Sequence, residues 1–256
     1  MKKNIGFVST RFSGTDGVTL EASKWAAVFQ QCGHQFFWFA GMSDRKPEHS
    51  FLVPEAFFQH EKNQWINKQV IGKGRRDSTV TDAIYDLKTY LKKQLKEFIQ
   101  TFNIDLLVAE NILTIPMHIP LGIALTEIIA ETQMPTIAHH HDFYWERTRF
   151  AVNAVGDYLR MAFPPNLTNI QHVVINSAAQ EELALRTGIS AVIIPNVQDF
   201  ENPPAVDEKH TEAFWQSIGL QTDDVMILQP TRIVQRKGIE HAIELVAQRR
   251  RYATRG

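Results

Sequence analysis

The sequence has 256 residues, of which 44% are hydrophobic and 21% are charged, and its formal net charge at pH 7 is −1. A chain of this length can bury a sizeable core as one or two domains, and its near-zero charge does not indicate a nucleic-acid or bilayer partner. Its one cysteine, Cys32, excludes an internal disulfide. Because it also lacks a signal-peptide pattern and any run of roughly 18 apolar residues, we expect a cytoplasmic protein without a transmembrane segment.

The first forty residues have the pattern of a strand, a helix and a second strand. A short apolar run over 4–9 is followed by the polar loop SGTDGV, by helical periodicity over 18–31 and by an apolar run over 33–40. Parallel strands joined through a helix form a βαβ unit. This unit predicts a parallel sheet with helices on both faces.

Strands and helices continue to alternate along the chain. Residues 41–78 show little periodicity, so we expect a long irregular insertion there. Beyond it, the expected strands are 105–109, 135–139, 172–176 and 191–194, and the expected helices are 84–102, 121–130, 150–161 and 178–187. This order predicts a doubly wound, Rossmann-like parallel α/β sheet.

A polar, proline-rich segment, PNVQDFENPPAVD, is the best candidate for a domain boundary. We therefore expect one domain over 1–195 and a second over 196–256. The second should contain a helix over 208–218, a buried strand from Ile227 and a helix opening at Gly238. Because so few residues cannot bury a complete core, we expect a truncated second domain, either part of a longer enzyme or an appendage packed on the first domain.

The loop before that last helix carries Arg232, Arg236 and Lys237. The first N–H groups of a helix are unpaired and its dipole is positive there, so a phosphate is attracted, and two side-chain charges suit a diphosphate. The alternative is that these are solvated loop cations, as most loop cations are.

The segment PTRIVQRKGIEHAIE resembles the start of the nucleotide-sugar-binding domain of retaining GT-B glycosyltransferases of family 4. The resemblance implies a GT-B fold in which Arg232 and Lys237 hold the diphosphate of a nucleotide-diphosphate sugar, with no cofactor and no metal ion. The family's paired glutamates, spaced E-x7-E, are not matched by Glu240 and Glu244. We therefore predict that this chain alone is catalytically inactive.

The loop over 13–18 lies where an open α/β sheet normally receives its ligand. Gly17 would let a sugar or phosphate approach the backbone closely. With only Gly14 and Gly17, the loop lacks the GxGxxG spacing, which disfavours a nicotinamide enzyme. The family commonly has GGV here, with Asp16 standing in place of the first glycine, and the resemblance implies that Asp16 and Gly17 bind substrate. A plain turn is the alternative.

The cluster HHHDFYWER follows the fourth expected strand. Consecutive histidines suggest zinc, but neighbours in an extended chain point to opposite faces and no HExxH or CxxC motif supports them, so we expect no metal. The family resemblance implies that His141 contacts the transferred sugar, with His140 as the fallback and Asp142 shaping the acceptor pocket. A buried structural histidine is the alternative. Glu110, after the third strand, ends at the same edge without an assigned role.

Asn196, in IPNVQDF, resembles the PNG-type turn that leads into the second domain of this family. There the asparagine helps to fix the crevice between the domains. We expect a structural role for Asn196 first and a substrate contact second.

These features together predict a glycosyltransferase fragment that transfers a sugar from a nucleotide-diphosphate sugar to an acceptor hydroxyl with retention. One alternative is a non-enzymatic α/β module that binds a phosphorylated ligand or a partner chain. Another is a GT-B type nucleotide-sugar epimerase, which needs no acceptor. The sequence does not identify the donor base, the sugar or the acceptor, and it leaves a homo-oligomer open.

Overall fold

The computed structural model describes residues 2–198, 200–203, 205, 207–221, 223–231 and 233–253. The side chains of Arg236 and of residues 249–253 lie outside this description. The chain divides into two compact units, Met1–Val197 and Gln198–Gly256. The division falls two residues beyond the boundary proposed from the sequence.

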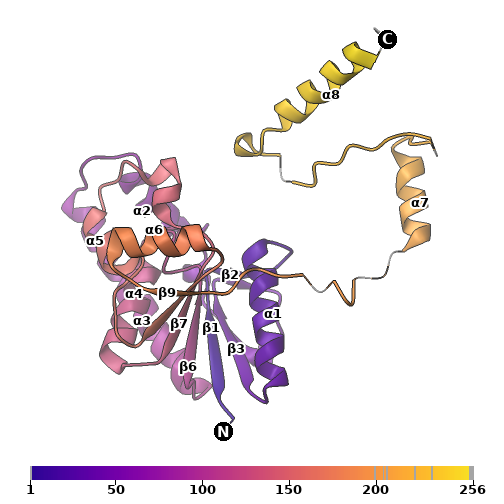
Figure 1. The fold of residues 1–256 in the computed structure, drawn as a ribbon. Coiled ribbons are helices and arrows are strands. Elements are labelled where there is room, and N and C mark those ends of the chain that lie inside the picture. The colour runs from indigo at the N-terminus through magenta and orange to yellow at the C-terminus, as the bar shows by residue number, and fades with distance from the viewer. Residues whose placement is uncertain are drawn as a thin grey trace. The chain divides into compact units, whose positions relative to one another are not determined.

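A seven-stranded parallel sheet forms the centre of the first unit (Figure 1). Its strands are β1 (Asn4–Val8), β3 (Gln35–Ala40), β5 (Ser50–Leu52), β6 (Leu106–Glu110), β7 (Thr136–His140), β8 (Ile170–Val174) and β9 (Ala191–Ile193). Their order in the sheet is β5-β3-β1-β6-β7-β8-β9. A separate parallel pair is formed by β2 (Arg11–Phe12) and β4 (Met42–Ser43). The predicted doubly wound α/β class is confirmed.

The strand order reverses between β1 and β6. From β1 the chain adds β3 and β5 on one side, and it then returns to add β6 to β9 on the other. At this reversal, Ser9 Oγ donates a 3.0 Å hydrogen bond to the carbonyl oxygen of Glu110. Ligands of open α/β sheets bind outside the carboxyl ends of the strands at such a switch point. This position defines where the site should be sought.

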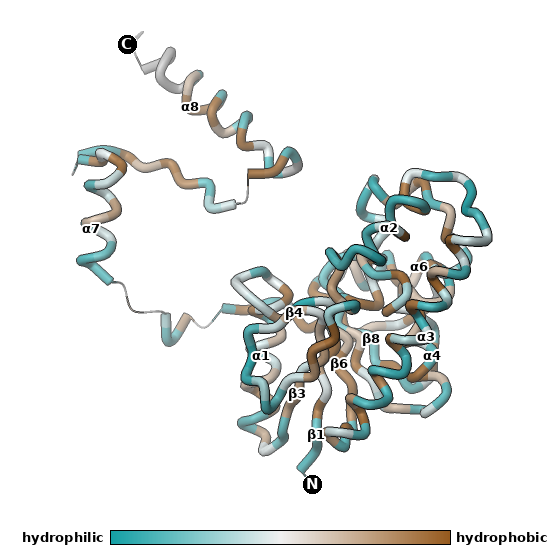
Figure 2. The backbone as a smooth tube through the Cα atoms, turned by 180° about the vertical axis from the view of Figure 1, so that it is seen from behind, coloured by the Kyte–Doolittle hydropathy of each residue, from teal (hydrophilic) through white to brown (hydrophobic). Residues whose placement is uncertain are grey.

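Helices cover both faces of the sheet (Figure 1). They are α1 (Gly17–Gln31), α2 (Glu61–Val70), α3 (Ser78–Thr101), α4 (Ile119–Thr132), α5 (Gly156–Ala162) and α6 (Ser177–Thr187), with short 3-10 turns η1 (Pro47–His49), η2 (Pro54–Ala56), η3 (Tyr144–Glu146) and η4 (Thr148–Phe150). The α1 residues Ala22 and Ala26 pack with Phe7 and Val108 on one face, and α3 and α4 pack on the opposite face. Figure 2 shows hydrophobic strands at the centre of this unit.

Two sequence-based expectations for this unit were wrong. Residues 41–78 are not irregular throughout, since they contain β5 and α2. The buried face of α2 includes Asn63, whose amide donates to the carbonyls of Phe58 and Met117. Because this buried residue is polar, the sequence of α2 does not show the regular spacing of apolar residues that predicts a helix. The helix expected over 150–161 begins only at Gly156, because the backbone at Asn153 forms an isolated bridge with Ile71.

The second unit contains α7 (Glu208–Ser217), the turn η5 (Gln235–Lys237) and α8 (Ile239–Ala253). The strand expected from Ile227 is not formed: residues 223–231 contain no strand, and Ile227 and Leu228 are exposed. A strand needs a neighbour to satisfy its backbone groups, and the described part of this unit has no other strand. None of the helices in the described ranges is long and apolar enough to cross a membrane.

Candidate active site

The carboxyl ends of β6 and β7 bring three polar side chains together on the face that α1 covers. Glu110 is paired in register with His139, and His141 follows His139 two residues later. Paired residues of parallel strands, and alternate residues of one strand, share a face of the sheet. Glu110 Oε2 lies 3.1 Å from His139 Nδ1 and 3.6 Å from His141 Nε2. We call these three residues the Glu-His-His cluster.

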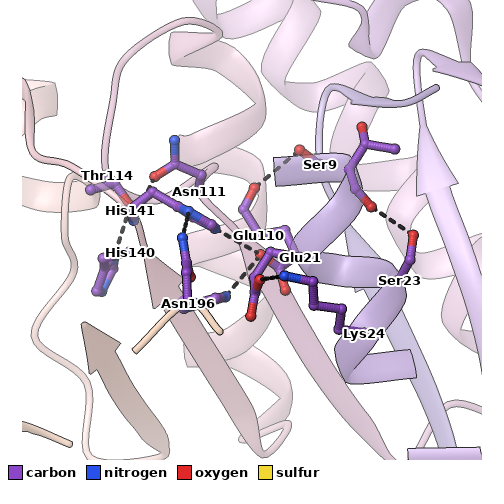
Figure 3. Close-up of polar contacts among 12 residues, drawn as sticks. Ser9, Glu21, Ser23, Lys24, Glu110, Asn111, Thr114, His140, His141 and Asn196 are labelled. Atoms are coloured by element: carbon purple, nitrogen blue, oxygen red, sulfur yellow. Dashed lines mark hydrogen bonds and ion pairs between the residues drawn. The ribbon is translucent and has the colours of Figure 1, made fainter. Parts of the chain in front are cut away.

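Further contacts hold His141 in place. Its ring centroid lies 4.5 Å from that of His139, which stacks on Trp25 of α1 with its centroid also at 4.5 Å. Its backbone N–H donates to Asn111 Oδ1 at 3.1 Å, and its Nδ1 lies 3.4 Å from Asn196 Nδ2. Figure 3 shows the side chains of Asn196 and Glu110 reaching the ring of His141 from two sides. Two residues singled out from the sequence, His141 and Asn196, are thus neighbours.

Burial shapes the electrostatics of Glu110. Its side chain is fully buried, and burial alone would raise the pKa of the carboxyl, but the imidazoles of His139 and His141 outweigh this effect and lower the pKa. Among the described residues, no lysine or arginine forms an ion pair with Glu110. Within the described residues, the side chains that lie against its Oε2 are therefore the two histidines.

His140 has a different place from its two neighbours. Its ring is buried, with Nδ1 2.6 Å from Thr114 Oγ1 and Nε2 2.9 Å from His172 Nδ1. Burial, together with the neighbouring His172, holds the pKa of His140 well below its usual range. Because both ring nitrogens are bonded inside the core, we assign His140 a structural role rather than the substrate contact considered from the sequence.

Asp142, the residue after His141, makes polar contacts in the loop that follows β7. Its Oδ2 forms an ion pair with the guanidinium of Arg147, with Nε at 2.6 Å, and its Oδ1 lies 3.4 Å from Asn111 Nδ2. The carboxylate is only partly exposed. Asp142 therefore fixes the loop after β7 and leaves limited room for a direct substrate contact.

The loop before α1 places Asp16 and Gly17 as a helix cap. Asp16 accepts from Thr19 N at 3.3 Å and Thr19 Oγ1 at 2.8 Å, and it pairs with Arg11 Nη2 at 2.8 Å. Burial would raise the pKa of Asp16, but the bonds from Thr19 and Arg11 outweigh it and lower the pKa. A Cβ at Gly17 would meet nothing within 4 Å, so its backbone is open to a ligand.

Lys24 of α1 is a further polar contact of this edge. Its Nζ lies 3.0 Å from Glu21 Oε2 and also donates to the carbonyl oxygen of Val197. Figure 3 shows the contact between Lys24 and Glu21. Lys24 thereby ties α1 to the segment that carries Asn196.

The two cations assigned to a diphosphate belong to the second unit. Lys237 is exposed at the end of η5, and its carbonyl oxygen accepts from Gln229 Nε2 at 2.8 Å. Arg232 lies outside the described residues. Gly238 has a positive φ of 59°, and a Cβ there would lie 2.9 Å from the His241 ring, so this turn into α8 requires glycine.

Glu110 and His139 received no role from the sequence. Each of the two residues lies at the carboxyl end of a buried apolar strand. The register of these two adjacent parallel strands brings the residues together, and this register was the signal that could have identified them. Which strands are adjacent depends on the topology of the whole sheet, and no local pattern specifies it.

Two curated proteins are similar to nearly the whole chain. Mannosylglucosylglycerate synthase of Petrotoga mobilis is 31% identical in an alignment that covers 95% of this chain and 56% of that protein. Mannosylglucosylglycerate synthase of Thermotoga maritima is 32% identical over 250 residues, with the same coverage of 95% and 56%. The chain thus spans a little more than half of the length of the curated relatives it matches. No family model matches the sequence.

A solved structure shares the fold. WaaG, described as a glycosyltransferase involved in lipopolysaccharide biosynthesis, aligns with a TM-score of 0.55 at 13% identity, covering 94% of this chain and 58% of its own. The predicted Rossmann-like fold of the GT-B type is therefore confirmed. The curated relatives are named as synthases, and the solved structure is described as a glycosyltransferase.

Proposed function

We propose that the complete protein is a glycosyltransferase that uses a nucleotide-diphosphate sugar. The observation that carries the proposal is the similarity to two mannosylglucosylglycerate synthases over 95% of this chain. The site at the switch point agrees with this proposal, because the backbone of Gly17 at the start of α1 is open to a ligand and His141 lies beside Asn196.

The proposed division of roles follows the two units. Arg232 and Lys237 would hold the diphosphate, where negative charge grows as the glycosidic bond breaks. Cations already in place stabilise that charge more in the transition state than in the ground state, which raises the rate of bond cleavage. His141 would contact the transferred sugar, and we propose that the new bond keeps the configuration of the donor. On this account no metal ion is needed at the diphosphate.

The name of the relatives suggests the substrates. It describes a product that contains mannose, glucose and glycerate. We therefore propose a nucleotide-diphosphate mannose as donor and glucosylglycerate as acceptor, with attack by an acceptor hydroxyl at the edge formed by Gly17, His141 and Asn196. A cytoplasmic location remains a prediction from the single cysteine.

Calorimetric titration with UDP, GDP and ADP tests the donor site in this chain. We expect weak binding of one of these nucleotides, and we expect the double variant Arg232→Ala, Lys237→Ala to lose it. Lys209→Ala is the matched control, because Lys209 is an exposed lysine of α7. Equal binding by the double variant would contradict the assignment of the two cations.

Turnover separates the rival functions. An epimerase would isomerise the donor sugar without an acceptor, whereas a binding module would bind nucleotide without turnover at any chain length. A transferase should consume donor only when the acceptor is present. We further propose that this chain alone does not transfer sugar, and robust transfer by it would overturn that proposal.

A further inference from the structure

The Glu-His-His cluster has the composition of a metal site. It offers two imidazole nitrogens and one carboxylate oxygen, which lie within 4.8 Å of one another. The alternation of side chains that argued against a metal separates only His140 from its neighbours. His139 and His141 are two residues apart, so they share the face on which Glu110 lies.

Of the two distances from Glu110 to the histidines, the one to His139 is a hydrogen bond and the one to His141 is not. Glu110 Oε2 and His139 Nδ1 are 3.1 Å apart, whereas Glu110 Oε2 and His141 Nε2 are 3.6 Å apart, too far for a hydrogen bond. Two ligands of one tetrahedral ion, with bonds of about 2.1 Å, lie about 3.4 Å apart. The two observed distances bracket this value.

Unsatisfied atoms point to the same conclusion. Each member of the cluster has a buried polar atom without a hydrogen-bond partner: Glu110 Oε1, His139 Nε2 and His141 Nε2. A buried polar atom without a partner is costly, and a buried carboxylate without a cation is more so. A divalent ion between the three side chains would bond His141 Nε2 and supply the charge that no described lysine or arginine gives to Glu110.

The environment of His141 also suits a ligand histidine. A metal-bound imidazole usually donates its other N–H to an oxygen acceptor, which fixes the ring. The other nitrogen, Nδ1, lies 3.4 Å from the side-chain amide of Asn196. A 180° rotation of that amide would present its oxygen to Nδ1–H. Asn196 would then be the outer partner of His141.

We infer that Glu110, His139 and His141 bind one divalent transition-metal ion of the zinc type. Imidazole ligands favour zinc and related ions, whereas Mg²⁺ and Ca²⁺ prefer oxygen ligands. Three protein ligands leave a fourth position for water or a substrate oxygen. The inference does not depend on the proposed transferase activity. If both hold, that open position is where a sugar hydroxyl would meet the cluster.

Metal titration of the chain tests this inference without any turnover. The chain is purified without a polyhistidine tag, freed of metal with a chelator, and titrated with Zn²⁺ by calorimetry and with Co²⁺ by visible absorption. We expect one ion per chain, a Co²⁺ spectrum typical of four or five ligands, and a rise in the melting temperature with Zn²⁺.

Three variants test whether the proposed side chains bind the metal ion. Glu110→Gln and His141→Ala should each weaken Zn²⁺ binding by more than the roughly 100-fold that loss of an outer partner costs, and Asn196→Ala should weaken it about 10- to 100-fold. His210→Ala, an exposed histidine of α7, is the control and should bind as the parent chain does. Circular dichroism checks that each variant is folded.

Two results would overturn the inference. One is the absence of saturable 1:1 binding by the parent chain, which would leave a hydrogen-bonded triad as the account of the cluster. The other is binding that Glu110→Gln, His141→Ala and Asn196→Ala leave unchanged. Because Asn196 is exposed, its variant keeps the test decisive even if a core substitution fails to fold.

Discussion

Two adjacent histidines at the end of β7, His140 and His141, lie in different surroundings. His140 is bonded to Thr114 and His172 inside the core, whereas His141 meets Glu110 and Asn196 at the edge of the sheet. The histidines are adjacent in sequence, and the alternation of a strand separates their roles. The sequence predicted that neighbouring histidines point to opposite faces, and the contact of His141 with a sugar stays a prediction. It did not predict which histidine Glu110 meets, because that depends on which strands are neighbours.

Because His140 and His141 lie in different surroundings, we expect their substitution to lower the free energy of unfolding by different amounts. His140→Ala should lower the free energy of unfolding by about 2–4 kcal/mol, because it leaves a cavity and removes the partners of Thr114 and His172. His141→Ala should cost less, since its ring lies at the edge of the sheet. Urea unfolding of both variants measures the difference, and equal costs would contradict the two roles.

His118 predicts a pH dependence of stability. It is fully buried at the start of α4, where Nδ1 accepts from Leu121 N and Nε2 lies 2.8 Å from the carbonyl oxygen of Glu55. Burial lowers the pKa of His118 from 6.5 to about 4. The unfolded chain therefore binds a proton that the folded chain does not, so this stability is present above pH 6.5 and is lost as the pH falls towards about 4.

Unfolding free energies measured between pH 7 and 4.5 test this effect. In His118→Gln, the slope with pH should be shallower by about one proton, or about 1.4 kcal/mol per pH unit, in the range between the two pKa values. His172, whose pKa burial also lowers to about 4, and His140, whose pKa burial lowers too, remain in both proteins and contribute to the residual slope. Identical slopes would show that His118 does not titrate in this range.

Secondary-structure elements show what periodicity can predict. The long helix α3 was predicted from Ile84 onward because its buried residues Ile84, Leu87, Leu91, Leu95 and Phe98 recur every three or four positions, whereas its first turns, with the buried Val80, were not predicted. The strands β1, β3, β6 and β7 were predicted because they are short apolar runs between turn signals. α2 was missed because its buried face includes an asparagine, and β5 was missed because three residues carry too little pattern.

We expect replacement of glycine by alanine to have opposite effects on stability at Gly122 of α4 and Gly17 of α1. A Cβ at Gly122 of α4 would lie 2.2 Å from the ring of Phe163, whereas a Cβ at Gly17 of α1 would meet nothing within 4 Å. Gly122→Ala should therefore cost about 1–3 kcal/mol of unfolding free energy despite a better helix propensity. Gly17→Ala should keep or slightly raise stability. Similar stability of the two variants would contradict the packing of α4 on Phe163.

The chain divides into two units that differ in how many apolar side chains they bury. The hydrophobic clusters that the structure defines lie within the first unit, between Ile5 and Ala191. In the second unit, Ile227, Leu228 and Ile243 are exposed. The sequence predicted a change of domain near Pro195 from composition. It also predicted a strand that the described residues do not form, because a strand depends on neighbours that no local pattern supplies.

The first unit should therefore fold by itself. A chain that stops after Val197 should show a cooperative thermal transition, with a melting temperature within a few degrees of the parent chain, because it retains all three clusters. Circular dichroism and differential scanning calorimetry measure this. A non-cooperative transition would show that the first unit needs residues 198–256 for its stability.

The most direct test of the central claim is an assay of a polypeptide that spans the full length of the relatives, supplied with nucleotide-diphosphate mannose and glucosylglycerate. We predict acceptor-dependent release of nucleoside diphosphate and a mannoside whose anomeric configuration, read by NMR, matches that of the donor. The variant Lys237→Ala should lower the rate by about 100-fold or more, because it removes a cation from the developing charge. Donor consumption without acceptor, or no turnover with any nucleotide sugar, would contradict the account.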